Sequence, residues 1–222
     1  MLREIKNIAF FTVGITFLSL GIALLTLAGL GTSPIGSPMW ALYLVTGWSF
    51  GTWNFIICAL LVVLQWALLR KDFPQWYWVQ VPLALLQSVI LDGCMAICRS
   101  WHLTPTSYPL QILQMIIAVA IMALGIACEV STKKYFLPTE GILVAVSQVT
   151  RMKVPTIKVC NDVIFVLSGL AISFLFLSGI EGVREGTLVA AIMTGVFVGW
   201  MQGAVDTCYR VTVGSEPDPE TV

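Results

Sequence analysis

Six long apolar stretches dominate this chain and restrict the class of protein it can form. Each holds about 18 or more largely apolar residues, enough for a helix rising ~1.5 Å per residue to cross a hydrocarbon core of ~30 Å. Only 11% of the 222 residues are charged, whereas soluble domains carry roughly 25%. We predict an all-α integral membrane protein, surrounded by lipid, with spans at Ile8–Leu30, Thr52–Leu69, Trp76–Cys98, Pro109–Val130, Val159–Leu177 and Thr187–Val205.

The basic residues predict how these six helices are oriented. Lysine and arginine favour the cytoplasmic side of a membrane protein. With a cytoplasmic N-terminus, only Arg99 and Arg184 fall outside. Counting two further short apolar runs as spans would weaken this bias, so we predict six spans with both termini in the cytoplasm. The predicted cytoplasmic residues are Arg3, Lys6, Arg70, Lys71, Lys133, Lys134, Arg151, Lys153, Lys158 and Arg210. The net charge is zero, which gives no sign of a nucleic-acid partner.

The chain aligns with itself after a shift of 104 residues, which predicts two related halves. The shift superimposes Leu20-Gly21-Ile22-Ala23 on Leu124-Gly125-Ile126-Ala127, and Pro34 on Pro138. The matched glycine and proline positions carry most of the weight, because these residues punctuate the backbone. A unit of three spans is odd, so the second unit must enter the membrane from the opposite side. We predict inverted repeats over 1–104 and 105–212, followed by a disordered polar tail over 213–222.

Each half contains a short apolar run after its first span, over residues 35–47 and 139–150. About 12 residues are too few to cross the membrane as a helix. Ser33 and Pro34 stand before the first run, in positions typical of an N-cap and a first helical residue. We predict two re-entrant or broken helices that enter from opposite sides, buried in protein or lining a wet cavity. The alternative is a pair of helices lying flat at the interfaces, which the lack of a continuous polar face over Ile35–Val45 disfavours.

Polar residues at the starts of the two short runs are the candidate binding residues. At the start of the first short run, backbone N–H groups and hydroxyls attract an anionic group. At the start of the second short run, the Glu140 carboxylate attracts a cationic group. One site could then bind both charged ends of a zwitterion. Trp40 either stacks on the solute or packs within the fold. The predicted solute-binding residues are Thr32, Ser33, Pro34, Gly36, Trp40, Pro138, Thr139, Glu140 and Gly141.

Five acidic residues in or beside the predicted helices are candidates for coupling transport to a proton or another ion. Charges are costly inside a membrane, so each needs a reason. Asp92 either has this role or is neutralised by Arg99, seven residues later on one helical face. Glu129, Asp162 and Asp206 either line a cavity or lie at helix ends in headgroup water. Glu140 and Asp92 are therefore the preferred candidates. The full set is Asp92, Glu129, Glu140, Asp162 and Asp206.

Motifs for catalysis or metal binding are lacking in the sequence. Cys94, Cys98 and His102 share one helical face, but the first and last are separated by ~12 Å in a regular helix, too far for one ion. HExxH, GxSxG and paired CxxC patterns are missing. We therefore predict no metal, no cofactor and no enzymatic activity.

A stripe of small residues runs along the last span, at Gly195, Gly199 and Gly203. Glycine at every fourth position lets two helices approach closely. The stripe serves either packing within the fold or a contact between two copies in a homodimer.

The residues Gly21-Ile22-Ala23-Leu24, followed by Leu30-Gly31-Thr32-Ser33-Pro34 and a tryptophan-bearing short run, resemble the YczE/YyaS/YitT-like bacterial membrane proteins. The resemblance implies a multi-pass protein of the bacterial cytoplasmic (inner) membrane with a transport role, and it supplies no substrate or binding residues. Combined with the repeat, it favours a transporter (permease) for a small polar or zwitterionic solute, working by alternating access around a midplane site. The alternatives are a passive channel and a membrane-embedded regulatory or assembly protein without transport.

Overall fold

The computed structural model describes residues 2–177, 179 and 182–214, and every regular element in these residues is a helix. Six helices are long and apolar enough to cross a membrane, which confirms the six predicted spans. Apart from Val213 and Gly214, the predicted tail over 213–222 lies outside the described residues. The α-helices are α1 (Leu2–Leu27), α2 (Gly36–Thr46), α3 (Phe50–Leu69), α4 (Gln80–Ser100), α5 (Tyr108–Thr132), α6 (Pro138–Thr150), α7 (Val154–Phe176) and α8 (Glu185–Val213).

The ends of the long helices differ from the predicted span ends, because hydropathy marks the apolar part of a helix and not its full length. α8 runs on to Val213, past the predicted end at Val205, through polar residues that still form helical turns. The segment before α4 forms two 3-10 helices, η1 (Arg70–Asp72) and η2 (Gln75–Val79), so the predicted third span begins in 3-10 geometry. Helices therefore extend beyond the residues that hydropathy assigns to hydrocarbon.

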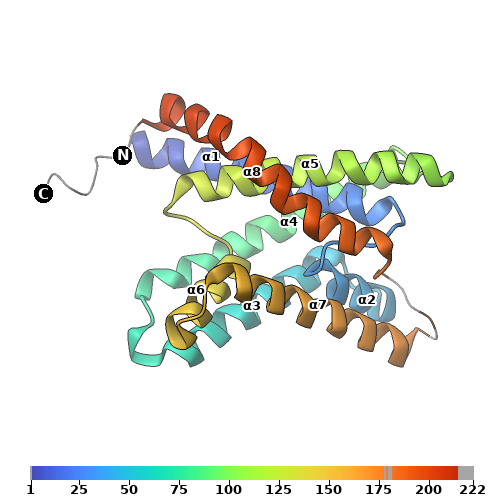
Figure 1. Ribbon diagram of the computed structural model, residues 1–222, viewed down its shortest axis with the longest axis horizontal. Coiled ribbons are helices and arrows are strands. Elements are labelled where there is room, and N and C mark those ends of the chain that lie inside the picture. Colours follow the sequence, from blue (N-terminus) through green and yellow to red (C-terminus); the bar gives the residue numbers. More distant parts are fainter. Residues whose placement is uncertain (1, 178, 180–181, 215–222) are drawn as a thin grey trace, which may run out of the picture.

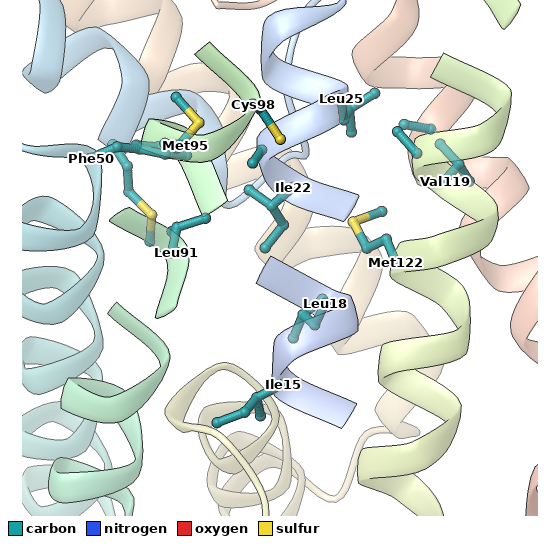
Figure 2. Close-up of a cluster of buried hydrophobic side chains, with 14 of the residues drawn as sticks. Ile15, Leu18, Ile22, Leu25, Phe50, Leu91, Met95, Cys98, Val119 and Met122 are labelled. Carbon is teal, nitrogen blue, oxygen red and sulfur yellow. The ribbon is translucent and has the colours of Figure 1, made fainter. Parts of the chain in front are cut away.

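The first helix, α1, is the centre of the largest core, between α4 and α5. In Figure 2, Ile15 and Ile22 point to the side of α4, where Leu91 lies, while Met122 and Val119 on α5 lie beside the opposite face of α1. These side chains are almost completely buried. Burial of this apolar cluster fixes α1 against both neighbours.

Glycines bring the backbones of α1 and α5 together. A Cβ atom on Gly21 would lie 2.6 Å from the Met122 nitrogen, and one on Gly125 would lie 2.7 Å from the Leu18 Cα. Neither position can hold a side chain without separating the helices. Such contacts between small residues are a common source of helix association in membranes, where lipid offers no hydrophobic driving force.

The remaining helices form a second group beneath α1, α5 and α8 (Figure 1). In this group α2 packs against α7 and α3, while α6 packs against α3 and α7. Helix α4 contacts both α1 and α3 and so joins the two groups. The chain crosses between the groups several times, so the short helices are held by segments from both halves of the sequence.

The start of the first short helix, α2, differs from the prediction. α2 begins at Gly36, with Ile35 in helical geometry at its N-cap, so Pro34 is not the first helical residue. Ser33 still performs a capping role, because its hydroxyl accepts a hydrogen bond from the Gly36 N–H at 3.3 Å. Pro138 opens α6 as its first residue. Both helices run from buried starts to exposed ends.

The glycine stripe on α8 faces away from the rest of the described chain. A Cβ atom at any of Gly195, Gly199 or Gly203 would meet nothing within 4 Å. The interpretation of the stripe as packing within the fold is therefore wrong. Ile192 and Trp200 are also more than 70% exposed on α8, so this helix presents a broad apolar surface.

Substitution of Gly125 by alanine should destabilise the protein by about 1–3 kcal/mol, the usual cost of overpacking a tight contact. Gly195→Ala is the matched control, because both glycines lie inside a helix and only Gly125 meets a neighbouring backbone. We expect Gly195→Ala to be neutral or slightly stabilising, since alanine is the better helix former. Thermal unfolding of the two purified variants in detergent measures the difference, and equal melting temperatures would contradict the proposed role of the contact.

Candidate functional site

The start of α6 is where buried polar side chains from several helices converge. Glu129, near the end of α5, is 3% exposed, and its Oε1 accepts a hydrogen bond from the Leu137 N–H at 2.7 Å. Glu140 lies in the first turn of α6, where its Oε2 accepts a hydrogen bond from the Thr139 hydroxyl. The interpretation of Glu129 as a helix-end residue in headgroup water is therefore wrong. Its carboxyl is enclosed by protein and anchors the turn that leads into α6.

An amide pair from α3 and α4 closes the site next to Gly141. Gln65 and Gln80 are fully buried, and each donates a hydrogen bond to the other, at 3.0 and 3.1 Å. Gln65 also donates to the Pro138 carbonyl at 3.3 Å. A Cβ atom on Gly141 would lie 2.6 Å from the Gln65 oxygen and 2.7 Å from the Gln80 oxygen. Glycine at this position therefore lets the amide pair contact the α6 backbone directly.

Two carboxyl groups of this site lie within electrostatic reach of each other. Glu129 interacts with Glu140, and both act on the buried thiol of Cys58 in α3. On the other side, Glu140 is within electrostatic reach of Lys158 and Asp162 on α7, which form an ion pair at 3.8 Å. The cluster therefore contains three carboxyl groups and one ammonium group, which favours a cationic or hydrogen-donating guest.

The start of α2 has its polar groups occupied by neighbouring protein atoms. Thr32 is completely buried, with its hydroxyl 2.8 Å from that of Thr26 and its N–H donating to the Gly182 carbonyl at 3.0 Å. Ser37, also fully buried, donates its N–H to the Ser33 carbonyl at 3.0 Å. These bonds fix the segment before α2 in place and use the groups that were predicted to bind an anion.

An apolar cluster connects the starts of the two short helices. Ile35, just before α2, packs against a cluster that contains Ile142 and Leu143 of α6, together with Phe165 of α7. The polar residues at the two starts are thus joined through hydrophobic contacts. A solute that touches both ends at once would have to displace part of this cluster.

Two of the predicted coupling residues hold helices together. Asp92 on α4 accepts hydrogen bonds from the Gly51 N–H and the Ser49 hydroxyl, both at 2.6 Å, and so ties α4 to the start of α3. The predicted pairing of Asp92 with Arg99 is wrong, because the Arg99 guanidinium lies over the Tyr43 ring at 5.2 Å.

Asp206 has a comparable role between α5 and α8. It accepts hydrogen bonds from the Ser131 hydroxyl at 2.6 Å and from the Gln202 amide at 2.9 Å. The Gln202 amide also donates to the Ser131 hydroxyl, at 3.0 Å. This small network fastens α8 to α5 near the end of α5 that carries Glu129.

Trp40 packs within the fold. Its ring stacks on Tyr43 with centroids 4.8 Å apart, and it meets the edge of Phe50 at 5.9 Å. A Cβ atom on Gly182 would lie 2.7 Å from the indole. These contacts occupy the ring from several directions, as expected of a core side chain.

Sequence reasoning missed the uncharged polar residues inside the spans. Besides the Gln65–Gln80 pair, Asn54 on α3 donates to the Ser88 hydroxyl at 2.8 Å and to the Gln87 amide oxygen at 3.4 Å. The available signal was an amide side chain in the middle of an apolar helix. Such a group needs a partner in a membrane protein, because lipid supplies none.

Removing both amides of the Gln65–Gln80 pair should cost less than the two single removals added together. We expect Gln65→Met and Gln80→Met each to destabilise the protein by about 1–3 kcal/mol, because each leaves a buried amide without its partner. The double variant should lose less than the sum of the two single variants. Thermal unfolding of all four proteins gives the coupling energy, and strictly additive losses would contradict the direct contact.

Comparison with known proteins identifies a family but no function. A sequence model of a family of unknown function (DUF6198) matches residues 5–203, nearly the whole chain. No curated protein and no solved structure matches the chain. The family match neither names a solute nor assigns roles to residues, so the function has to be inferred from the site.

Proposed function

We propose that this chain, which belongs to the DUF6198 family of unknown function, is a membrane transporter for a small polar or zwitterionic solute. The observation that carries the proposal is the burial of the Glu129 carboxyl and the Gln65–Gln80 pair around the start of α6, where Glu140 is partly buried. Buried ionisable groups are expensive in a membrane protein and usually mark the path of a substrate or an ion. The proposed mechanism is alternating access around this site.

Contacts at positions 104 residues apart support an inverted repeat. Gly21 approaches Met122, and the shifted pair, Gly125 and Leu18, makes the corresponding approach. The shift of 104 residues carries Leu18 to Met122 and Gly21 to Gly125. A second set is related in the same way: Gly141 meets Gln65 while Gly169 meets Ser37, and the shift carries Ser37 to Gly141 and Gln65 to Gly169. Two-fold related halves would produce both sets of reciprocal contacts.

The ends of α2 and α6 support the same repeat. Gly47 and Arg151, 104 residues apart, both end their helices in left-handed geometry, with φ of 73° and 60°. The Gly47 N–H donates to the Tyr43 carbonyl, and the Arg151 N–H donates to the Ser147 carbonyl. A residue in left-handed geometry after the last turn is a common helix stop. The two short helices therefore share one local design.

The burial pattern of the short helices favours re-entrant segments over helices lying flat. A flat interfacial helix exposes one face along its whole length. In α2, Gly36 through Met39 are buried, whereas Leu44 through Thr46 are exposed; α6 changes in the same direction, from Pro138 to Thr150. Figure 1 places α2 and α6 towards opposite ends of the axis along which the long helices run. Both features fit helices that enter from opposite faces.

The proposed solute carries a cationic or hydrogen-donating group that binds between Glu129 and Glu140. The amide oxygens of Gln65 and Gln80 lie beside Gly141, the residue after Glu140, and each can accept a further hydrogen bond. An anionic group of the solute would bind at Thr32 and Ser33 only after it replaces the hydrogen bonds that occupy their polar groups and the apolar contact around Ile35 opens. Proton coupling falls to Glu129 and Glu140, because Asp92 and Asp206 are engaged in ties between helices.

We propose a location in the bacterial inner membrane, which the resemblance to the YczE/YyaS/YitT-like proteins supports. The distribution of basic residues favours both termini in the cytoplasm. A homodimer through Gly195, Gly199 and Gly203 is favoured by the outward direction of this stripe. The same exposed surface is the observation that favours the alternative of an assembly protein without transport.

A thermal-shift screen of the purified protein tests the proposed site. The panel contains amino acids, aliphatic amines and amphoteric vitamins, each added singly. A ligand at one hundred times its dissociation constant stabilises the folded state by about 2.7 kcal/mol, a shift of roughly 5–10 °C for a protein of this size. We expect at least one compound to give such a shift, and Glu129→Gln and Glu140→Gln to remove it.

Glu185→Gln is the matched control, because Glu185 is exposed at the start of α8 and does not contact the start of α6. It should respond to the same compound as the wild-type protein does. A panel without any hit, or a hit that survives both Glu129→Gln and Glu140→Gln, would argue against binding at the start of α6.

Cysteine labelling tests the re-entrant geometry. In a background that lacks the exposed Cys160 and Cys208, a membrane-impermeant maleimide should label Val149→Cys rapidly from the cytoplasmic side and Leu44→Cys from the opposite side. Thr139→Cys, at the start of α6, should react at least tenfold more slowly than Val149→Cys, because the start of the helix is enclosed by protein. Equal rates at both ends of α6 would indicate a helix lying flat at the interface.

A further inference from the structure

A cavity lies at the end of α5, and its lining differs in charge from the buried site at the start of α6. It measures about 620 Å³, within the ~300–1,000 Å³ range of small-molecule pockets. The cavity lies between η2, just before α4, and the segment that joins α5 to α6. Its lining residues are Gln75, Trp76, Val79, Lys133, Lys134 and Tyr135.

Two lysines give this cavity a positive charge. Lys134 donates a hydrogen bond to the Glu4 carboxylate at 2.7 Å, and this bond raises the pKa of Lys134, so the ammonium stays charged. Lys133 makes no ion pair with any residue in the described ranges, although the Asp206 carboxylate is within its electrostatic reach. Because Lys134 offsets the charge of Glu4, the Lys133 ammonium, which has no ion-pair partner among the described residues, remains able to bind an anionic ligand.

The surroundings of the cavity match the headgroup level of a membrane. Trp76 and Trp78 are 50% and 45% exposed, at the start of the third long apolar segment, and tryptophan at such positions is typical of the membrane–water interface. Lys133 caps the end of α5, another spanning helix. Basic pockets between transmembrane helices on the cytoplasmic side are suited to the headgroups of anionic lipids.

Exposed apolar side chains continue from the cavity along the same helices. Leu86 on α4 is 38% exposed, two turns beyond Val79 in the cavity wall, and Val130, one turn before Lys133 on α5, is 51% exposed. A ligand seated in the cavity would thus find a polar, cationic pocket for its head and an apolar surface for its chains. A soluble phosphate compound has no acyl chains that could contact this apolar surface.

We infer that this cavity binds the phosphate group of an anionic phospholipid, with Lys133 and Lys134 as ligands of the phosphate and Trp76 at the glycerol level. The site is separate from the buried carboxyl groups and does not depend on the proposed transport function. Its occupation links η2 to the α5–α6 connection, so the bound lipid stabilises the folded protein in the membrane.

Native mass spectrometry of the detergent-solubilised protein tests this inference by titration with phosphatidylglycerol, phosphatidylcholine and sn-glycerol 3-phosphate. Each lysine near the phosphate contributes about a fivefold change in affinity at low salt. Because two lysines line the cavity, we expect phosphatidylglycerol to bind about 25-fold tighter than phosphatidylcholine. The preference should fall about fivefold in Lys133→Gln and disappear in the double variant Lys133→Gln/Lys134→Gln.

Two controls separate the lysines from the ion pair and from charge in general. Glu4→Gln breaks the ion pair but keeps both lysines, and it should retain or increase the preference. Lys71→Gln removes an exposed lysine of the α3–α4 connection that does not line the cavity, and it should leave binding unchanged. The single variant Lys133→Gln keeps the test decisive if the double variant fails to fold.

Three results would overturn the inference. Equal binding of the two phospholipids would show that charge is not recognised, and an undiminished preference in Lys133→Gln would place the site elsewhere. Displacement of phosphatidylglycerol by an equal concentration of sn-glycerol 3-phosphate would identify the cavity as a site for soluble phosphate compounds instead of lipid.

Discussion

The close contact of α1 with α5 is the interaction on which the rest of the structure depends. Gly21 and Gly125 let the two backbones touch, and lipid gives no hydrophobic drive that would replace this fit. The contact extends to Gly14, where a Cβ atom would lie 3.3 Å from the Glu129 nitrogen. The glycine contacts therefore reach the helical turn that carries Glu129 and that supports the start of α6.

Around this axis, several polar groups bond to partners from other parts of the chain. Glu129 accepts a hydrogen bond from the Leu137 N–H, and Asp206 accepts one from the Ser131 hydroxyl. Gln65, paired with Gln80, donates one to the Pro138 carbonyl. Lipid cannot satisfy such groups, so their pairing defines how the helices meet. The acids differ in their contacts: Asp92 and Asp206 connect helices, whereas Glu129 and Glu140 lie within electrostatic reach of each other and form no ion pair with any base among the described residues. That difference supports the choice of the α6 start as the functional site.

The sequence predicts the helices well because length and hydropathy act locally. All six spans and both short helices occur where apolar runs were found, and errors were confined to ends such as that of α8, where polar residues continue the helix. The candidate site was predicted less well. Glu140 and Gly141 were identified from the self-alignment, but the burial of Glu129 depends on the chain folding back at Leu137, and the Gln65 partner comes from another helix. Such long-range pairings leave no local pattern.

Counterflow in proteoliposomes tests the central claim most directly. Vesicles loaded with an unlabelled solute that raises the melting temperature are diluted into a trace of the same solute in labelled form. A carrier with one alternately exposed site should accumulate the label transiently above its equilibrium level, and Glu129→Gln should abolish this overshoot. Equilibration without an overshoot would indicate a channel, and an overshoot that is unchanged in Glu129→Gln would contradict the assignment of the site to the start of α6.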